Sequence, residues 1–258
     1  MRGRAVLAAS HGGVYVAGVV LRLGLGGVIL SDAGVGRERA GVAGLDLLDT
    51  HLVPAAAVSA HSARIGNGAD CLARGVISFA NAAAQSIGVS KGIPARDALH
   101  RMAVAPHEPV GPIPIVEEGR WRMPGASGID VIAADSSSLV GPDDQGAIVV
   151  AGSHGALLGG RPETAVKWPV LAAIYNDAGL GIDGAAITRL PALDARGIAA
   201  ATVSAWHRRR PVLSGGWLHN ARQRPSRVAR SRDRHLMQGA CRSPARGCLA
   251  ANISQDEP

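Results

Sequence analysis

Residues 6–12 read Val-Leu-Ala-Ala-Ser-His-Gly, and residues 149–155 read Val-Val-Ala-Gly-Ser-His-Gly. Two further pairs of segments match in the same order: residues 28–36 with 173–181, and residues 53–60 with 198–205. The spacing is 143 residues at the first match and 145 residues at the later ones. Matched blocks in one order at nearly constant spacing predict an internal duplication.

Each copy contains short, continuous apolar runs separated by stretches with helical periodicity, such as residues 14–23 and 40–48. Apolar runs of this length are typical of strands that are covered on both faces of a sheet. Alternating strands and helices favour parallel strands joined by right-handed crossovers. We therefore expect an α/β protein of two tandem Rossmann-like repeats with parallel sheets, the second repeat truncated and followed by an irregular basic C-terminal tail.

The expected boundaries are residues 1–105 for the first repeat, 106–128 for a Pro-rich connector, 129–206 for the incomplete second repeat and 207–258 for an Arg-rich tail that is frameshifted or disordered. Within the first repeat, residues 69–87 are expected to form a helix. An additional strand at residues 130–135 is expected to precede the second copy.

The net positive charge of the chain comes entirely from this tail. Residues 207–258 hold eleven Arg and three acidic residues, whereas the preceding residues hold 16 basic and 17 acidic ones. An Arg-rich segment is typical of an arm that binds nucleic acid. A shifted reading frame in a GC-rich gene is the other interpretation, because out-of-frame codons there often encode Arg, Pro, Ala and Gly.

The genetic code offers a check on the second interpretation. Residues 215–224 can be encoded as GGA GGA TGG CTA CAT AAC GCG CGC CAA CGC. Read one base later, this string gives Glu-Asp-Gly-Tyr-Ile-Thr-Arg-Ala-Asn and then Ala. Residues 73–82 read Ala-Arg-Gly-Val-Ile-Ser-Phe-Ala-Asn-Ala, so Gly, Ile, Ala, Asn and Ala coincide. Although the codons are chosen rather than known, the agreement favours a frameshift, and we do not expect nucleic acid as a partner.

Polar residues stand where the matched strands are expected to end, which is where ligands bind in open parallel sheets. A His and an Asp at neighbouring strand ends suit a general base and its orienting partner. The expected catalytic residues are therefore His11, Asp32, His154 and Asp177. The expected substrate-binding residues are Ser10, Gly12, Gly13, Ser31, Arg64, Ser153 and Asn176. Arg64, in a Gly-rich loop, offers a planar donor fork to a carboxylate or phosphate.

Each of these patterns also has a purely structural interpretation. Ser-His-Gly can close a tight turn and cap a helix, and an Asp before glycines can accept backbone N–H bonds. Residues 179–184 match G-x-G-x-x-G, but the first copy does not keep the third Gly, and an Asp directly before the motif would repel a pyrophosphate. The sequence identifies no cofactor, and we predict no metal site. A divalent ion could bind only if the two copies brought His11, Asp32, His154 and Asp177 together.

The leading hypothesis is a small-molecule enzyme, a hydrolase or isomerase of a carboxylate-bearing metabolite, with its site between the repeats. The sequence leaves open a metabolite-binding module without chemistry, a nucleic-acid binder acting through the tail, and an inactive frameshifted product. Three cysteines are too few for a disulfide framework, and no apolar run is long enough to span a bilayer. We expect a cytoplasmic protein with a small-molecule ligand and no membrane partner; whether it forms homo-oligomers is left open.

Overall fold

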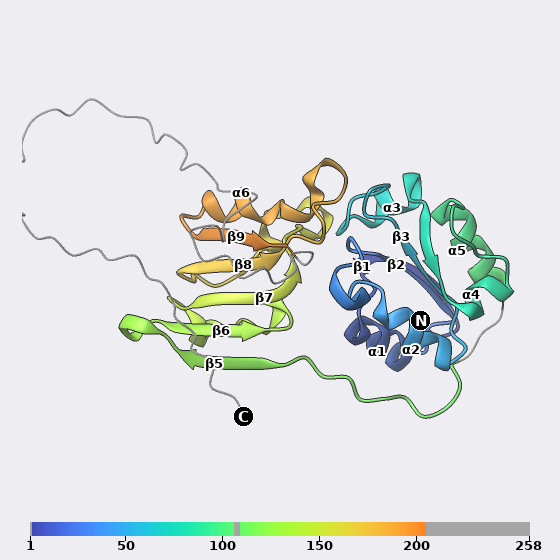
Figure 1. Cartoon of the computed structure of the whole chain (residues 1–258), viewed down its shortest axis with the longest axis horizontal. Coiled ribbons are helices and arrows are strands. Elements are labelled where there is room, and N and C mark those ends of the chain that lie inside the picture. The colour runs from blue at the N-terminus through green and yellow to red at the C-terminus, as the bar shows by residue number, and fades with distance from the viewer. Residues whose placement is uncertain (1, 106–108, 205–258) are drawn as a thin grey trace, which may run out of the picture. The chain divides into compact units, whose positions relative to one another are not determined.

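A computed structural model describes residues 2–105 and 109–204 of the chain (Figure 1). The Arg-rich segment 207–258, with both interpretations of it, lies outside the described residues. We refer to residues 2–105 as the first half and to residues 129–204 as the second half.

The first half contains a four-stranded sheet with the strand order β1-β2-β3-β4. Its strands are β1 (Ala5–His11), β2 (Gly27–Ser31), β3 (Ala55–Val58) and β4 (Ile77–Ala80). Its helices are α1 (Val14–Leu23), α2 (Ala43–Thr50), α3 (Gly68–Arg74), α4 (Ala82–Ser86) and α5 (Ala95–Val104). Strands β1, β2 and β3 are parallel, whereas β4 runs antiparallel to β3.

The second sheet has five strands in the order β5-β6-β7-β8-β9. They are β5 (Arg120–Pro124), β6 (Asp130–Ala134), β7 (Ile148–His154), β8 (Ala172–Asn176) and β9 (Ala199–Val203), with α6 (Arg189–Asp194) between the last two. Strand β5 is antiparallel to β6, and the other strands are parallel. Short 3₁₀ turns are η1 (Arg37–Arg39), η2 (Ala126–Gly128), η3 (Ser137–Leu139), η4 (Pro142–Asp144), η5 (Leu158–Gly160), η6 (Pro162–Thr164) and η7 (Ile182–Ile187).

The chain is α/β, as predicted, but the prediction of purely parallel sheets is wrong, because each sheet carries one antiparallel edge strand. The helix expected over residues 69–87 is instead α3, β4 and α4. Gly75 ends α3 in an extended conformation, and the Asn81 side chain caps α4 by accepting a hydrogen bond from the Ala84 N–H. Helix α1 occupies the expected residues 14–23, and β6 starts at the expected residue 130.

The first sheet is covered on both faces (Figure 1). Along β2, Val28 and Leu30 pack with α1 and α2, whereas Ile29 points to the opposite face. There Cys71 of α3 and three residues of α5 pack with the strand residues Ala56 and Val58 in one buried cluster; the α5 residues are Ala95, Ala98 and Met102. Because both faces are buried, the strands read as continuous apolar runs rather than alternating ones.

The two halves meet through backbone and small side chains. The Ile182 N–H donates to the carbonyl of Ala60 at 2.8 Å, and the Gly159 N–H donates to the carbonyl of Gly66 at 2.7 Å. A small apolar cluster joins them as well, with the buried residues Ile65, Ala156, Ala178 and Ala186 and the half-buried Ala33. These contacts bring the carboxyl ends of β1 and β7 to one place.

The Asp-Ala-Gly-x-Gly turns have unusual backbone conformations in both halves. In the first turn, Ala33, Gly34, Val35 and Gly36 all have φ between +47° and +68°. In the second turn, Ala178 to Gly181 have φ between +42° and +69°. Positive φ in a β-branched residue such as Val35 is rare and costs free energy, so the surrounding contacts must hold the turn in this form.

Gly34 offers a test of this close approach. A Cβ at Gly34 would lie 2.6 Å from the carbonyl oxygen of Ala178, whereas a Cβ at Gly146 would have open space, at nearly the same φ (+68° and +74°). Gly146→Ala should cost about 1 kcal/mol of unfolding free energy from the left-handed backbone alone. Gly34→Ala should cost at least about 1 kcal/mol more because it also forces the two turns apart. Urea unfolding of both variants measures the difference, and equal costs would contradict the contact.

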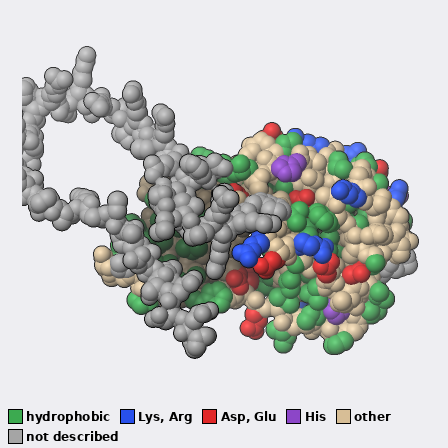
Figure 2. Space-filling model, viewed as in Figure 1, with side chains coloured by type: hydrophobic (Ala, Val, Ile, Leu, Met, Phe, Trp, Pro, Cys, Tyr) green, Lys and Arg blue, Asp and Glu red, His purple; other side chains and the backbone are tan. Residues whose placement is uncertain are grey.

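Within residues 2–105 and 109–204, no helix combines the length and the apolar character needed to cross a membrane. On the face drawn in Figure 2, the charged side chains of the described residues are interspersed, with both signs present over the first half.

Candidate functional site

The two Ser-His-Gly segments occupy the same structural position in their sheets. The register of β1 against β2 shifts between Leu7 and His11, and that of β7 against β8 shifts between Val150 and His154. After each irregularity, the Gly N–H donates to the neighbouring strand at 3.0 Å: Gly12 to the carbonyl of Ser31, and Gly155 to the carbonyl of Asn176. The same irregularity therefore interrupts the regular strand pairing just before each His.

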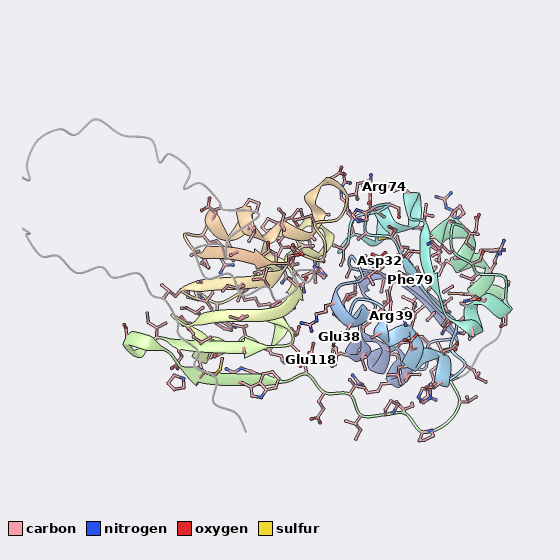
Figure 3. The ribbon with its side chains drawn as sticks, viewed as in Figure 1. Asp32, Glu38, Arg39, Arg74, Phe79 and Glu118 are labelled. Atoms are coloured by element: carbon pink, nitrogen blue, oxygen red, sulfur yellow. The ribbon has the colours of Figure 1, made fainter. Side chains whose placement is uncertain are left out.

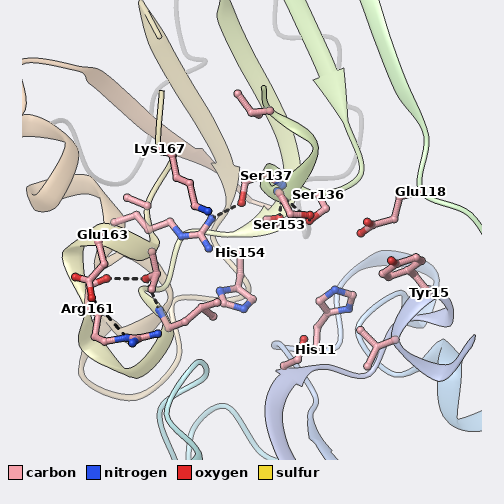
Figure 4. Close-up of a pocket in the computed structure, with 18 of the residues that line it drawn as sticks. His11, Tyr15, Glu118, Ser136, Ser137, Ser153, His154, Arg161, Glu163 and Lys167 are labelled. Carbon is pink, nitrogen blue, oxygen red and sulfur yellow. Dashed lines mark hydrogen bonds and ion pairs between the residues drawn. The ribbon is translucent and has the colours of Figure 1, made fainter. Parts of the chain in front are cut away.

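Both imidazoles are held by the same backbone contact. Nδ1 of His11 accepts a hydrogen bond from the Gly13 N–H at 3.1 Å, and Nδ1 of His154 accepts one from the Ala156 N–H at 3.2 Å. A backbone N–H can only donate, so each neutral ring carries its proton on Nε2. The two rings point toward one another in Figure 4. Each therefore presents an N–H donor to the space between them.

Burial keeps both rings neutral. It lowers the pKa of His154 from its usual 6.5 to about 3, with smaller contributions from the nearby charge of Arg189 and from His11. Burial also lowers the pKa of His11. At neutral pH the site therefore holds two uncharged imidazoles.

The depressed pKa of His154 predicts a loss of stability in acid. Between pH 6.5 and about 3, the unfolded chain binds a proton at this residue that the folded chain does not bind. The stabilisation is thus present above pH 6.5 and is lost as the pH falls toward 3, by about 2 kcal/mol at pH 5. Chemical denaturation at pH 7.5 and pH 5 should show a smaller drop for His154→Gln than for the wild type. The exposed-residue control His61→Gln should behave like the wild type, and an unchanged drop in His154→Gln would contradict the argument.

The two Ser-His pairs line one cavity of about 620 Å³ (Figure 4). Its walls come from both halves and from the connector. Besides Ser10, His11, Ser153 and His154, the lining residues with polar or aromatic groups are Tyr15, Glu118, Ser136, Ser137, Ser138, Arg161, Glu163, Thr164, Lys167, Trp168 and Arg189.

Arg189 is the most unusual residue of this cavity. It is 4% exposed, and its guanidinium donates from Nη1 to Oγ of Ser137 at 2.9 Å. Within the described part of the chain, no Asp or Glu forms an ion pair with it, and its Nε has no hydrogen-bond partner. Burial lowers its pKa, while the nearby Tyr175 phenol favours the charged form. A buried cation without an anionic partner is costly, so this position is suited to an anionic ligand.

The guanidinium of Arg189 lies over the aromatic ring of Tyr175 in a cation–π contact. The guanidinium carbon lies 5.0 Å from the ring centroid. No hydrogen bond of normal geometry joins the two residues, since both Tyr175 Oη and Arg189 Nε are without a partner among the described residues. A guanidinium over an aromatic face is attracted to the ring and can still donate its N–H groups to a ligand.

Sequence reasoning missed Arg189, although the repeat contains a signal for it. The Arg189 N–H donates to the carbonyl of Gly155 at 2.7 Å, just as the Gly44 N–H donates to the carbonyl of Gly12 at 2.8 Å. In the first half a side chain at this position is impossible, because a Cβ at Gly44 would lie 2.5 Å from the carbonyl oxygen of Gly13. Arg189 therefore stands where the first copy has Gly44, and this difference between the copies is the signal that sequence reasoning could have used.

Glu118 reaches the cavity from the connector, which the sequence treated as a linker (Figure 3). Burial raises the pKa of its carboxyl group, and the charge of Asp135 raises it further, whereas the hydroxyls of Tyr15 and Ser136 act in the opposite direction. A carboxyl group with a raised pKa at the edge of a cavity is suited to proton transfer.

The structure places the two aspartates away from the cavity walls. Both are buried, and neither lines this cavity. Asp32 accepts hydrogen bonds through Oδ1 from the N–H groups of Gly34 and Ala60, and through Oδ2 from the Ser78 hydroxyl. Asp177 accepts one from the Gly179 N–H. These contacts are the turn-closing ones of the structural interpretation, and they hold the strained turns described above.

The other expected substrate-binding residues divide between the cavity and the scaffold. Ser10 and Ser153 line the cavity, and Ser153 Oγ accepts a hydrogen bond from the Ser137 N–H at 2.9 Å. Four others serve backbone turns and close packing: Gly12, Gly13, Ser31 and Asn176. Arg64 lies outside the cavity.

Arg64 is instead engaged by carboxylates. Its guanidinium is 2.7 Å from Asp183 and 3.3 Å from Asp70, and Arg74 binds the same two residues. This exposed network joins the two halves and leaves Arg64 without a free donor fork.

A second, smaller cavity of about 170 Å³ also borders both imidazoles and is lined by the two Asp-Ala-Gly turns. In the portion of the chain that the structure describes, no group of three or more His, Cys, Asp or Glu side chains is placed to hold a metal ion. Of the four residues considered for a metal, His11 and His154 line the cavity, whereas Asp32 and Asp177 accept hydrogen bonds within the turns.

Comparison with protein-family models, with curated proteins and with solved structures found no match to this chain.

Proposed function

We propose that the chain is a small-molecule enzyme, a hydrolase or isomerase of a carboxylate-bearing metabolite, built from two Rossmann-like units related by duplication. Its site is the cavity between the two Ser-His segments. One observation carries the proposal: Arg189 is a buried guanidinium that faces this cavity without a carboxylate partner among the described residues. Guanidinium groups bind carboxylates through two parallel hydrogen bonds.

In this proposal Arg189 and the Ser137 hydroxyl hold the substrate carboxylate. The hydroxyl already contacts the guanidinium, so both groups converge on one spot in the cavity wall. Lys167 and Arg161 add positive charge to the same cavity. Their charge favours entry of an anion, whereas the buried Arg189 fixes its orientation.

The two imidazoles act as hydrogen-bond donors. Because Nδ1 of each accepts a backbone N–H, Nε2–H is the group left to face a ligand. A neutral imidazole donor stabilises negative charge that develops on a carbonyl oxygen. His11 and His154 are thus assigned to polarising a carbonyl group near the bound carboxylate, in place of the general-base role expected for them.

This tautomer favours the isomerase over a serine hydrolase. A nucleophilic Ser needs a base that accepts its proton. The nitrogen of each ring that could accept a proton is already occupied by the backbone. Ser10 and Ser153 are therefore assigned to binding.

Glu118 is assigned to proton transfer. Its carboxylate takes a proton from the carbon next to the polarised carbonyl, the electron pair moves onto the carbonyl oxygen, and the protonated carboxyl returns the proton to a different atom. The raised pKa of Glu118 makes its carboxylate a better base at neutral pH.

The test uses 2-oxo and 2-hydroxy carboxylates of three to six carbons, incubated with the full-length protein in D₂O and followed by proton NMR. Wild-type protein should exchange the C–H next to the carbonyl of at least one member. Glu118→Gln should abolish the exchange and leave binding within about threefold, since its side chain does not hold the carboxylate. Binding without any exchange or product would instead assign the chain to the non-catalytic metabolite-binding class. No binding by any member would refute the carboxylate site.

A further inference from the structure

The second sheet has one bare apolar face in the described residues. Val150 and Val203 are 38% and 50% exposed on it, and Ile174 and Ala201 are half-buried. The opposite face of the same sheet is fully packed, with Val149, Ala173 and Tyr175 in a core cluster. Parallel sheets are normally covered on both faces, so the bare face indicates a missing layer.

In the first half, helices cover the equivalent face of the sheet. By the repeat alignment, Val150, Ile174, Ala201 and Val203 correspond to Leu7, Ile29, Ala56 and Val58. Of these, Ile29, Ala56 and Val58 are at most 1% exposed. They are buried in one cluster with residues of α3 and α5, which follow β3 in the chain. The open edge also differs, because β4 pairs with β3, whereas no described strand pairs with the outer edge of β9.

The codons of the region after Ala205 limit what the next reading frame can encode, whichever synonymous codons are used. Trp217 followed by Leu218 can give only Gly one base later, and the first copy has Gly75 there. His219 followed by Asn220 can give only Ile or Thr, at the position of Ile77.

The same spacing of 142 residues predicts residues well beyond the segment that first indicated the frame. His235 followed by Leu236 can give only Ile or Thr, at the position of Ile93. Gln238 followed by Gly239 can give only Lys or Arg, at the position of Arg96. The agreement is partial. Asp233 can give only Ile or Thr where the first copy has Lys91, Leu236 can give only Leu, Ser or a stop where it has Pro94, and Met237 can give only Cys where it has Ala95.

The agreement also reaches upstream to the break itself. His207 followed by Arg208 can give only Ile or Thr, at the position of Ile65. The in-frame match ends at Ala205, which corresponds to Ala60 with a spacing of 145. The change of frame therefore falls between these two residues.

We infer that the reading frame changes between Ala205 and His207, and that the codons of residues 207–238 encode, one base later, the layer that covers the bare face of the second sheet. That layer is the counterpart of residues 65–96, which span α3, β4, α4 and the start of α5. Its strand pairs with the outer edge of β9 as β4 pairs with β3.

Two residues of the segment encoded in the next frame correspond to residues with defined hydrogen bonds in the first half, Ser78 and Asn81. The Ser78 hydroxyl donates to Asp32 at 2.8 Å, and the next frame has Thr or Met at this position. A Thr would supply the same donor to the buried Asp177. The position of Asn81 permits Asn, whose amide in the first half joins the start of β3 to the first turn of α2 and to the carbonyl of Val53.

The nucleotide sequence of the gene decides the frame. The next frame gives Ala-Asn-Ala at residues 222–224 only if these codons are CGC, CAA and CGC. Gln223 encoded as CAG would give Ser or an even less similar residue. Codons that fail at these three positions, or a stop codon in the next frame before residue 238, would overturn the inference.

Amide hydrogen exchange tests whether the segment encoded in the next frame covers the bare face of the second sheet. Three full-length proteins are compared: the chain as it exists, a frame-restored chain, and the existing chain with the order of residues 207–258 permuted. Amides of β9 should exchange at least tenfold more slowly in the frame-restored chain, with a thermal midpoint raised by about 5 °C or more. The permuted chain should match the existing one. Equal β9 exchange in the restored and existing chains, or a loss of protection on permutation, would contradict the proposed layer.

Discussion

Arg189→Met is expected to weaken carboxylate binding by about 100-fold while leaving the protein at least as stable as the wild type. Charge-assisted hydrogen bonds contribute about 1.5–3 kcal/mol each, and Met keeps the apolar stem against Tyr175 without the charge. The loss of a buried cation that has no ion pair among residues 2–105 and 109–204 removes a desolvation cost. Titration calorimetry with the tightest-binding carboxylate of the panel, together with urea unfolding, measures both quantities.

The control for Arg189→Met is a cation of the same cavity that is exposed. Arg161 lines the cavity, but its side chain is 68% exposed and lies 3.7 Å from Glu163. Arg161→Met should change affinity by no more than about threefold, because exposed charges are screened by solvent. Equal losses in the two variants would indicate a general effect of positive charge rather than a carboxylate held by Arg189. A large loss of stability in Arg189→Met would mean that the guanidinium serves the fold.

Much of the fold could be predicted because the duplication repeats its signals. Ser-His-Gly and Asp-Ala-Gly-x-Gly follow buried apolar runs in both copies, which located the strand ends and hence the two Ser-His pairs that line the cavity. The edge strands could not be predicted in this way. Strand β5 is exposed along its whole length, and β4 has four residues between two short helices, so neither has a periodic apolar pattern.

The candidate site was predictable in part, for a related reason. His11 and His154 lie where the repeat pattern placed them, but the role of each ring depends on a backbone N–H two residues away. The aspartates look equally polar in sequence, and only the closed turn reveals that Asp32 serves three donors of the scaffold. Glu118 comes from a segment that the pattern did not connect to the strand ends, so tertiary packing alone brings it to the cavity. Arg189 matches Gly44 in the repeat, but only the folded first half shows that a side chain is excluded at that position.

Asn81→Ala is expected to lower the free energy of unfolding by about 4 kcal/mol, the largest stability effect predicted for this chain. The side chain is 8% exposed, and its Oδ1 accepts hydrogen bonds from the N–H groups of Ala55 and Ala84, both at 2.9 Å. Its Nδ2 donates to the carbonyls of Val53 and Leu45. Removal leaves the Ala55 N–H at the start of β3 and the carbonyl of Val53 without this partner, each at a cost of about 1–3 kcal/mol, and also removes a helix cap.

Asn67→Ala is the matched control, because it removes the same side chain from the same kind of position. Asn67 caps α3 by accepting a hydrogen bond from the Asp70 N–H at 3.0 Å, but it is half-buried, and among the described residues its side chain forms no hydrogen bond to a strand. The loss of this cap should cost about 1 kcal/mol. Chemical denaturation of both variants separates capping from bridging. If Asn81→Ala cost no more than Asn67→Ala, the Asn81 amide would be a cap alone, and an Asn encoded at the matching position of the next frame would no longer point to a bridge onto β9.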